Sequence, residues 1–77
     1  MNTQIDTVDV GTKKVILNQK LTMYRNTIYD VSLDIKIAKM LEDEAQEKMA
    51  TERMKPLLTA VEFIENELLE VDNEQTS

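Results

Sequence analysis

The fold is decided by the stretch LNQKLTMYRNTIYDVSLDIKIAKMLEDEAQEKM, residues 17–49. Its apolar side chains recur at alternating spacings of four and three residues, and one acidic residue interrupts them. The positions of this stripe are Leu17, Leu21, Tyr24, Ile28, Val31, Ile35, Ala38, Glu42, Ala45 and Met49. A period near 3.5 residues keeps such a stripe on one side of a helix, as in a coiled coil.

A second stripe with the same alternation follows in MKPLLTAVEFIENELLEV, residues 54–71. It consists of Met54, Leu57, Val61, Ile64, Leu68 and Val71. A narrow apolar stripe on a long helix is not stable in water until a partner covers it. The two stripes therefore predict a protein that binds helices, either its own or those of another protein.

Composition excludes most other fold classes. The chain has 77 residues, enough for one small domain, with no Cys, no His, no Trp, one Gly and one Pro. So few turn residues favour long helices over a β architecture, and a chain without Cys can form neither disulfides nor thiolate zinc sites. Charged residues make up 31% of the chain and are spread along it, which argues against a membrane span. We therefore predict a soluble, cytoplasmic, all-α protein.

The residue types present also exclude most catalytic chemistry. Without His and Cys the chain can form no catalytic triad, thiol nucleophile or imidazole metal site, and Gly11 alone makes no phosphate-binding loop. Carboxylate pairs such as Asp30 and Asp34 lack the spacing of a calcium-binding loop, so we predict that they are solvated. We expect no enzyme activity, no cofactor and no metal. The net charge of −6 also makes nucleic-acid binding an unfavoured function.

The boundary between two helices is predicted where the stripes lose phase. The five residues from Met49 to Met54 break the alternation, and Pro56 is well tolerated at the first position of a new helix. We predict a long helix over about 13–51 and a shorter one over about 56–71, with a chain reversal between them. A kink in one continuous rod is the alternative. The two helices would form an antiparallel hairpin, completed as a coiled-coil-like bundle by oligomerisation.

The ends of the chain lack the stripe. We predict a flexible arm over 1–11, a single helical-hairpin domain over 12–71 and a disordered acidic tail over 72–77. Thr12 is the predicted N-cap of the first helix, because its hydroxyl can accept a hydrogen bond from a free amide of the first turn. A small β-hairpin over 5–17 is the alternative for the N-terminal end.

Charge is divided unevenly between the halves of the chain. Residues 1–40 carry six bases and four acids, a net of +2, whereas residues 41–77 carry three bases and eleven acids, a net of −8. Opposite signs would help to select an antiparallel pairing of the two halves. The alternative is that these charges belong to solvated outer surfaces that contribute little.

Two local features modify the stripes. Glu42 is either a polar core residue that sets register, or a solvated residue beside a stripe that shifts to Leu41. A secondary apolar patch, predicted to contact further helices or a foreign protein, consists of Leu33, Ile37, Met40 and Leu41.

The function predicted from these features is that of a small, non-enzymatic interaction protein, acting as an assembly or regulatory factor and most simply a homodimer. The interaction seam, as we name it, consists of Leu17, Leu21, Tyr24, Ile28, Val31, Ile35, Met54, Leu57, Val61, Ile64, Leu68 and Val71. Two alternatives stay open. One is an acidic inhibitor or nucleic-acid mimic that binds a basic cleft of an enzyme. The other is a structural component of a larger assembly, for instance of a phage.

Overall fold

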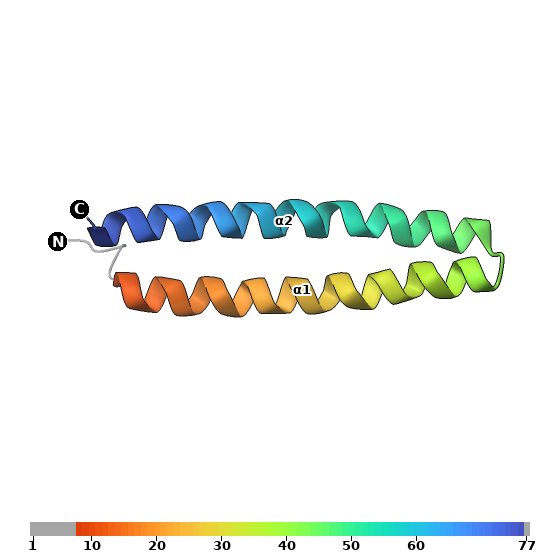
Figure 1. Cartoon of the computed structure of the whole chain (residues 1–77), viewed down its shortest axis with the longest axis horizontal. Helices are drawn as coiled ribbons and strands as arrows, with labels where there is room; N and C mark the ends of the chain where they lie inside the picture. The colour runs from red at the N-terminus through yellow and green to blue at the C-terminus, as the bar shows by residue number, and fades with distance from the viewer. Residues whose placement is uncertain (1–7, 77) are drawn as a thin grey trace.

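The computed structural model describes residues 8–76, which form two helices and no strand. Helix α1 spans Val10–Met40 and helix α2 spans Glu44–Thr76. They run antiparallel, so that the start of α1 and the end of α2 lie at the same end of the molecule (Figure 1). The predicted all-α helical hairpin is confirmed.

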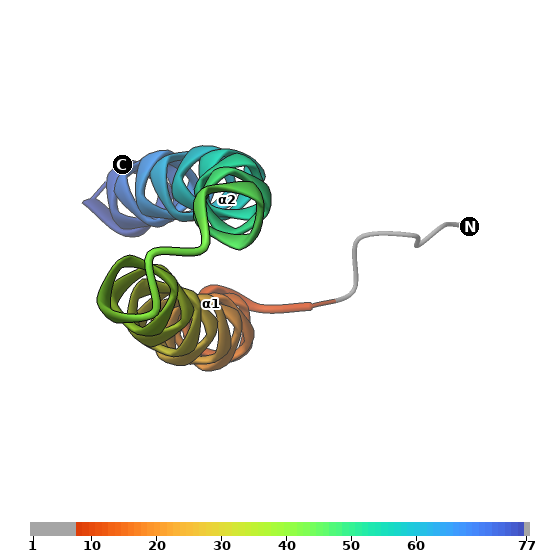
Figure 2. The same cartoon turned by 90° about the vertical axis from the view of Figure 1, so that its right-hand side faces the viewer.

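The hairpin is a single layer of two helices. Its principal extents are 58 × 24 × 14 Å, and a helix with its side chains is about 10–12 Å thick. The end-on view in Figure 2 shows α1 and α2 side by side. Among residues 8–76 each helix has the other as its one neighbour, and both broad faces of the layer are open.

Helix α1 begins with an aspartate cap, three residues before the predicted cap Thr12. The Asp9 backbone is extended, and its Oδ1 accepts a hydrogen bond from the Thr12 amide at 2.7 Å. Aspartate is the stronger capping residue of the two. Because residues 10–17 are helical, the alternative β-hairpin is wrong for them. Residues 1–7, which hold most of the predicted arm, lie outside the described residues.

The chain reverses at residues 41–43. Glu42 has a φ of 56°, in the left-handed region. Its amide donates to the Lys39 carbonyl at 3.1 Å, and the Asp43 amide donates to the Ala38 carbonyl at 2.9 Å. These two bonds form a Schellman motif, which satisfies carbonyls at the end of α1. Asp43 then caps α2, because its Oδ1 accepts from the Gln46 amide at 3.1 Å.

The predicted reversal between Met49 and Pro56 is therefore wrong in position, and so are the predicted helix bounds of 13–51 and 56–71. Pro56 lies inside α2, near its middle. The first stripe ends at Ala38, and its continuation through Ala45 and Met49 is accidental, since both side chains are exposed. The second stripe begins earlier than predicted, because Ala50 is buried and lies four residues before Met54.

Helix α2 also extends further than predicted at its other end. Residues 72–76, assigned to a disordered tail, continue the helix. Asp72 and Glu74 form ion pairs with Lys14 and Lys13 at 2.7 and 3.3 Å, which join this last turn to the start of α1.

The core is a single row of side chains between the helices. The buried apolar residues are Leu21, Val31 and Ala38 on α1, and Ala50, Ile64 and Val71 on α2, and of these Val31 is fully buried. All twelve residues of the interaction seam are buried or half-buried. The two stripes therefore cover each other, and this mutual burial supplies the apolar stabilisation of the hairpin.

Replacing Glu42 with Gly should stabilise the hairpin by about 0.5–1 kcal/mol. A left-handed conformation costs a non-Gly residue about 1–2 kcal/mol, and the greater freedom of Gly in the unfolded chain offsets part of this gain. Urea unfolding at fixed protein concentration measures the change. Lys48→Gly, at an exposed site inside α2, is the matched control and should destabilise by about 1 kcal/mol. Equal destabilisation by both substitutions would mean that Glu42 lies within a continuous helix.

Pro56→Ala should raise the free energy of unfolding by up to about 3 kcal/mol. Inside a helix, Pro lacks the amide that would donate to the residue four positions earlier, and its ring crowds that carbonyl. Thermal unfolding of Pro56→Ala beside Thr59→Ala, an exposed site in the next turn, measures the gain. A Pro at the first helical position would instead give almost no gain on replacement.

The Asp9 cap should make the start of α1 sensitive to acid. The hydrogen bond from the Thr12 amide, with a smaller contribution from the Thr12 side chain, lowers the pKa of the Asp9 carboxyl below its ordinary value of 3.8. Since the folded pKa is depressed, the cap stabilises the helix fully above the ordinary value, and this stabilisation is lost as the pH falls through the folded pKa. NMR titration of the Thr12 amide should show a midpoint below pH 3.8. Asp9→Asn should cap the helix and abolish this transition.

Candidate protein interaction face

The predicted interaction seam lies between α1 and α2, so its residues hold the hairpin together. The surfaces on either side of this seam are left for contact with other molecules. The hairpin has two such surfaces, because it is only one helix thick. They differ in shape and in chemistry.

One surface, which we call the grooved face, carries a row of shallow hollows. It is formed on α1 and its C-cap by Ile16, Lys20, Met23, Thr27, Asp34, Ile37 and Leu41. On α2 it is formed by Gln46, Met49, Arg53, Pro56, Ala60, Phe63 and Glu67. The α2 set follows the three-and-four spacing of a single helix side, and the α1 set follows it except at Asp30, which has this spacing but lines none of the hollows. The grooved face therefore runs the length of the hairpin, beside the seam.

The hollow nearest the reversal has a volume of about 290 Å³. Ala38 and Ala50 form its floor, and both are buried. Ile37 and Met49 stand at its sides. Two alanines at facing core positions leave room that larger side chains would fill, so the space is open to a side chain from outside.

A larger hollow, of about 630 Å³, lies further toward the termini. Its apolar lining includes Ile16 and Tyr24 from α1, and Pro56 and Phe63 from α2. A smaller hollow of about 220 Å³, between Met23 and Leu57, lies next to it along the face. Together the three hollows form an interrupted groove between the helices.

Large apolar side chains are exposed along this groove. The exposed fractions are 67% for Met23, 62% for Phe63, 58% for Met49, 48% for Ile37 and 42% for Ile16. The polar face, as we call the opposite surface, is formed next to the seam by Asn18, Arg25, Ser32, Lys39, Thr51, Leu58, Glu65 and Asp72. Only Leu58 among these is apolar. Outside the grooved face, Val15, Leu58 and Leu69 are also 54–62% exposed. The grooved face therefore differs from the other surfaces in the hollows that its apolar residues border between the two helices.

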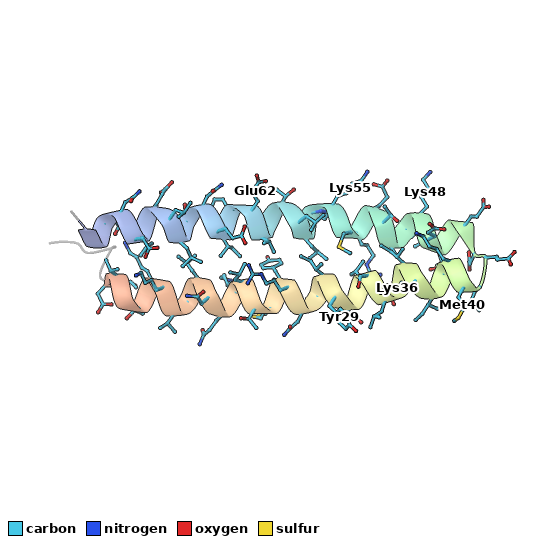
Figure 3. The ribbon with its side chains drawn as sticks, viewed as in Figure 1. Tyr29, Lys36, Met40, Lys48, Lys55 and Glu62 are labelled. Atoms are coloured by element: carbon cyan, nitrogen blue, oxygen red, sulfur yellow. The ribbon has the colours of Figure 1, made fainter. Side chains whose placement is uncertain are left out.

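The outer edges of the hairpin carry bases, an acid and an aromatic side chain. Figure 3 shows Lys48, Lys55 and Glu62 pointing away from α1, and Tyr29 and Lys36 pointing away from α2. These side chains lie far from both the seam and the groove. We assign them to solvent.

The two helices carry opposite charge. Helix α1 has six bases and two acids, a net of +4, and α2 has three bases and nine acids, a net of −6. Five ion pairs cross between them: the two at the termini, Arg25–Glu65 at 2.9 Å, Arg53–Asp34 at 3.4 Å and Lys39–Glu47 at 3.9 Å. In four of them the base lies on α1, in line with the antiparallel pairing predicted from the two halves. Each pair is solvent-exposed and contributes about 0–1 kcal/mol.

The secondary apolar patch is divided between two surfaces. Ile37 and Leu41 lie on the grooved face, whereas Met40 points away from α2 (Figure 3). Leu33, seven residues before Met40, shares its side of the helix and is half-buried. These four residues therefore do not form one contact surface.

Glu42 lies in the reversal and is exposed, so the hypothesis of a polar core residue is wrong. The seam does not shift to Leu41 either, because that side chain is exposed as well. The grooved face itself was missed by the sequence analysis. Its signal was the spacing of Met49, Pro56 and Phe63, seven residues apart on one side of α2.

Comparison of the chain with protein-family models, with curated proteins and with solved structures gave no significant match in any of the three. Among residues 8–76, no three acidic side chains converge as metal ligands would. Neither helix in this part of the chain is apolar enough over a sufficient length to cross a bilayer.

Proposed function

We propose that this protein is a non-enzymatic protein–protein interaction module that binds helices through its grooved face and acts as an assembly or regulatory factor. The observation that carries the proposal is the groove itself, with exposed Met23, Ile37, Met49 and Phe63 along it. A groove between two antiparallel helices accepts the side-chain ridge of a further helix, as in a helical bundle.

Exposed apolar side chains beside the hollows are the second support. Scattered apolar residues on a surface need no explanation, but apolar residues that gather around hollows between two helices mark an interaction site. Met23 and Met49 are unbranched and flexible, which lets them adapt to the helix they meet. The partner we propose is a second copy of the chain, so the protein is a homodimer with four helices.

The acidic-mimic alternative has less support. A mimic needs a continuous acidic surface, but Lys48 and Lys55 interrupt the outer edge of α2. Glu47 and Glu65 on this helix contact bases of α1. The acids of α2 therefore serve the hairpin as much as they face outward.

Sedimentation equilibrium of the purified chain tests the proposal, with Met23→Ser/Phe63→Ser as the disrupting double variant. We expect the unmodified chain to dimerise and the double variant to associate roughly ten-thousandfold more weakly. Two apolar side chains are removed from each copy, four in all, and at about 1.5 kcal/mol each they cost about 6 kcal/mol. Circular dichroism should show unchanged helix content, because both side chains are exposed in the hairpin.

The matched control is Leu58→Ser/Leu69→Ser, which changes two comparably exposed apolar residues of α2 outside the grooved face. Its association should equal that of the unmodified chain. A chain that stays monomeric at every concentration, or equal weakening by both double variants, would contradict the proposal.

A further inference from the structure

We infer that the second copy packs on the grooved face about a two-fold axis parallel to the helices, so that α1 of each copy lies against α2 of the other. This inference rests on the proposed function, because it specifies how the homodimer is built. Two hairpins can also stack face to face about an axis perpendicular to the helices. That arrangement would place α1 on α1 and α2 on α2.

Charge distinguishes the two arrangements. The charged residues of the grooved face itself are balanced on each helix, Lys20 with Asp34 on α1 and Arg53 with Glu67 on α2. The preference therefore rests on the whole helices: with nets of +4 on α1 and −6 on α2, a perpendicular axis brings together helices of like net charge. A parallel axis places each basic helix between two acidic ones, and every neighbouring pair in the four-helix bundle is then antiparallel. The attraction between the basic α1 and the acidic α2 within one hairpin would then also act between the helices of the two copies.

The register of the helices determines which residues this arrangement brings together. In four of the five ion pairs between the helices, the two residue numbers add up to 86 or 87. Positions that obey this relation therefore lie at the same height along the hairpin. Rotation about a parallel axis leaves heights unchanged, so a position on α1 meets the height-matched position on α2 of the other copy.

Two apolar contacts follow from this register. Met23 of one copy lies at the height of Phe63 of the other, and Ile37 lies at the height of Met49. All four side chains are exposed in the hairpin and belong to the grooved face. Lys20 and Glu67, on the two rims of the large hollow, match in height in the same way and carry opposite charges.

The size of the grooved face is sufficient. The outline of the hairpin is 58 × 24 Å, so one face presents on the order of 1,000 Å². A stable interface between two proteins buries about 800 Å² on each partner. Face-to-face packing can therefore reach the range of a stable dimer, whereas contact along the outer edges would bury a much narrower strip.

Crosslinking between single-cysteine variants tests the arrangement, because the natural chain contains no Cys. Met23→Cys and Phe63→Cys chains, one of them carrying a mass tag, are unfolded together in urea, refolded and treated with a short bismaleimide. We expect a mixed crosslinked dimer in up to about half of the chains, the fraction that random pairing places in mixed dimers. Ile37→Cys mixed with Met49→Cys should give the same product.

Met23→Cys mixed with Met49→Cys is the control, since these positions differ by about 20 Å in height at 1.5 Å per residue. It should give no mixed crosslink. A dimer by sedimentation that crosslinks only within single variants, or equally in all mixtures, would overturn the parallel axis and leave the proposed function standing. A monomer by sedimentation would overturn both.

Discussion

The reversal at Leu41–Asp43 determines where both apolar stripes point. The buried residues Ala38 and Ala50, on either side of it, are twelve residues apart. On one continuous helix, twelve residues would rotate the second stripe by about 120° away from the first. A straight partner helix could then cover only one stripe at a time. Because the Schellman motif turns the chain at this point, the two stripes face each other instead.

The same reversal sets the register of everything that lies beside the seam. It brings Lys39 opposite Glu47 and, further along, Asp34 opposite Arg53 and Lys14 opposite Asp72. It also aligns the short side chains of Ala38 and Ala50, which leaves a hollow open on one side. The grooved face is therefore a consequence of where the chain turns, and no separate element builds it.

Much of the fold was accessible from the sequence, because the stripes alone indicate two helices that cover each other. The position of the turn was not, since Ala45 and Met49 continue the first stripe by coincidence and Glu42 replaces the Gly that usually marks a Schellman motif. One signal was present: Asp43 followed three residues later by Gln46 is typical of a helix N-terminus. The candidate site was harder to predict, because charged and apolar residues alternate along the grooved face and obscure its period.

The opposite charges of α1 and α2 give this molecule a dipole moment across its width, from one helix to the other. At physiological ionic strength, electrostatic fields decay over about 8 Å, which is comparable to the spacing between two packed helices. A neighbour close to one edge therefore experiences mainly the charge of that edge, and the overall net charge of −6 describes the field only at greater range. An acidic surface would be approached through α1 and a basic surface through α2. The hairpin can thus orient itself before contact, even towards partners of the same net sign.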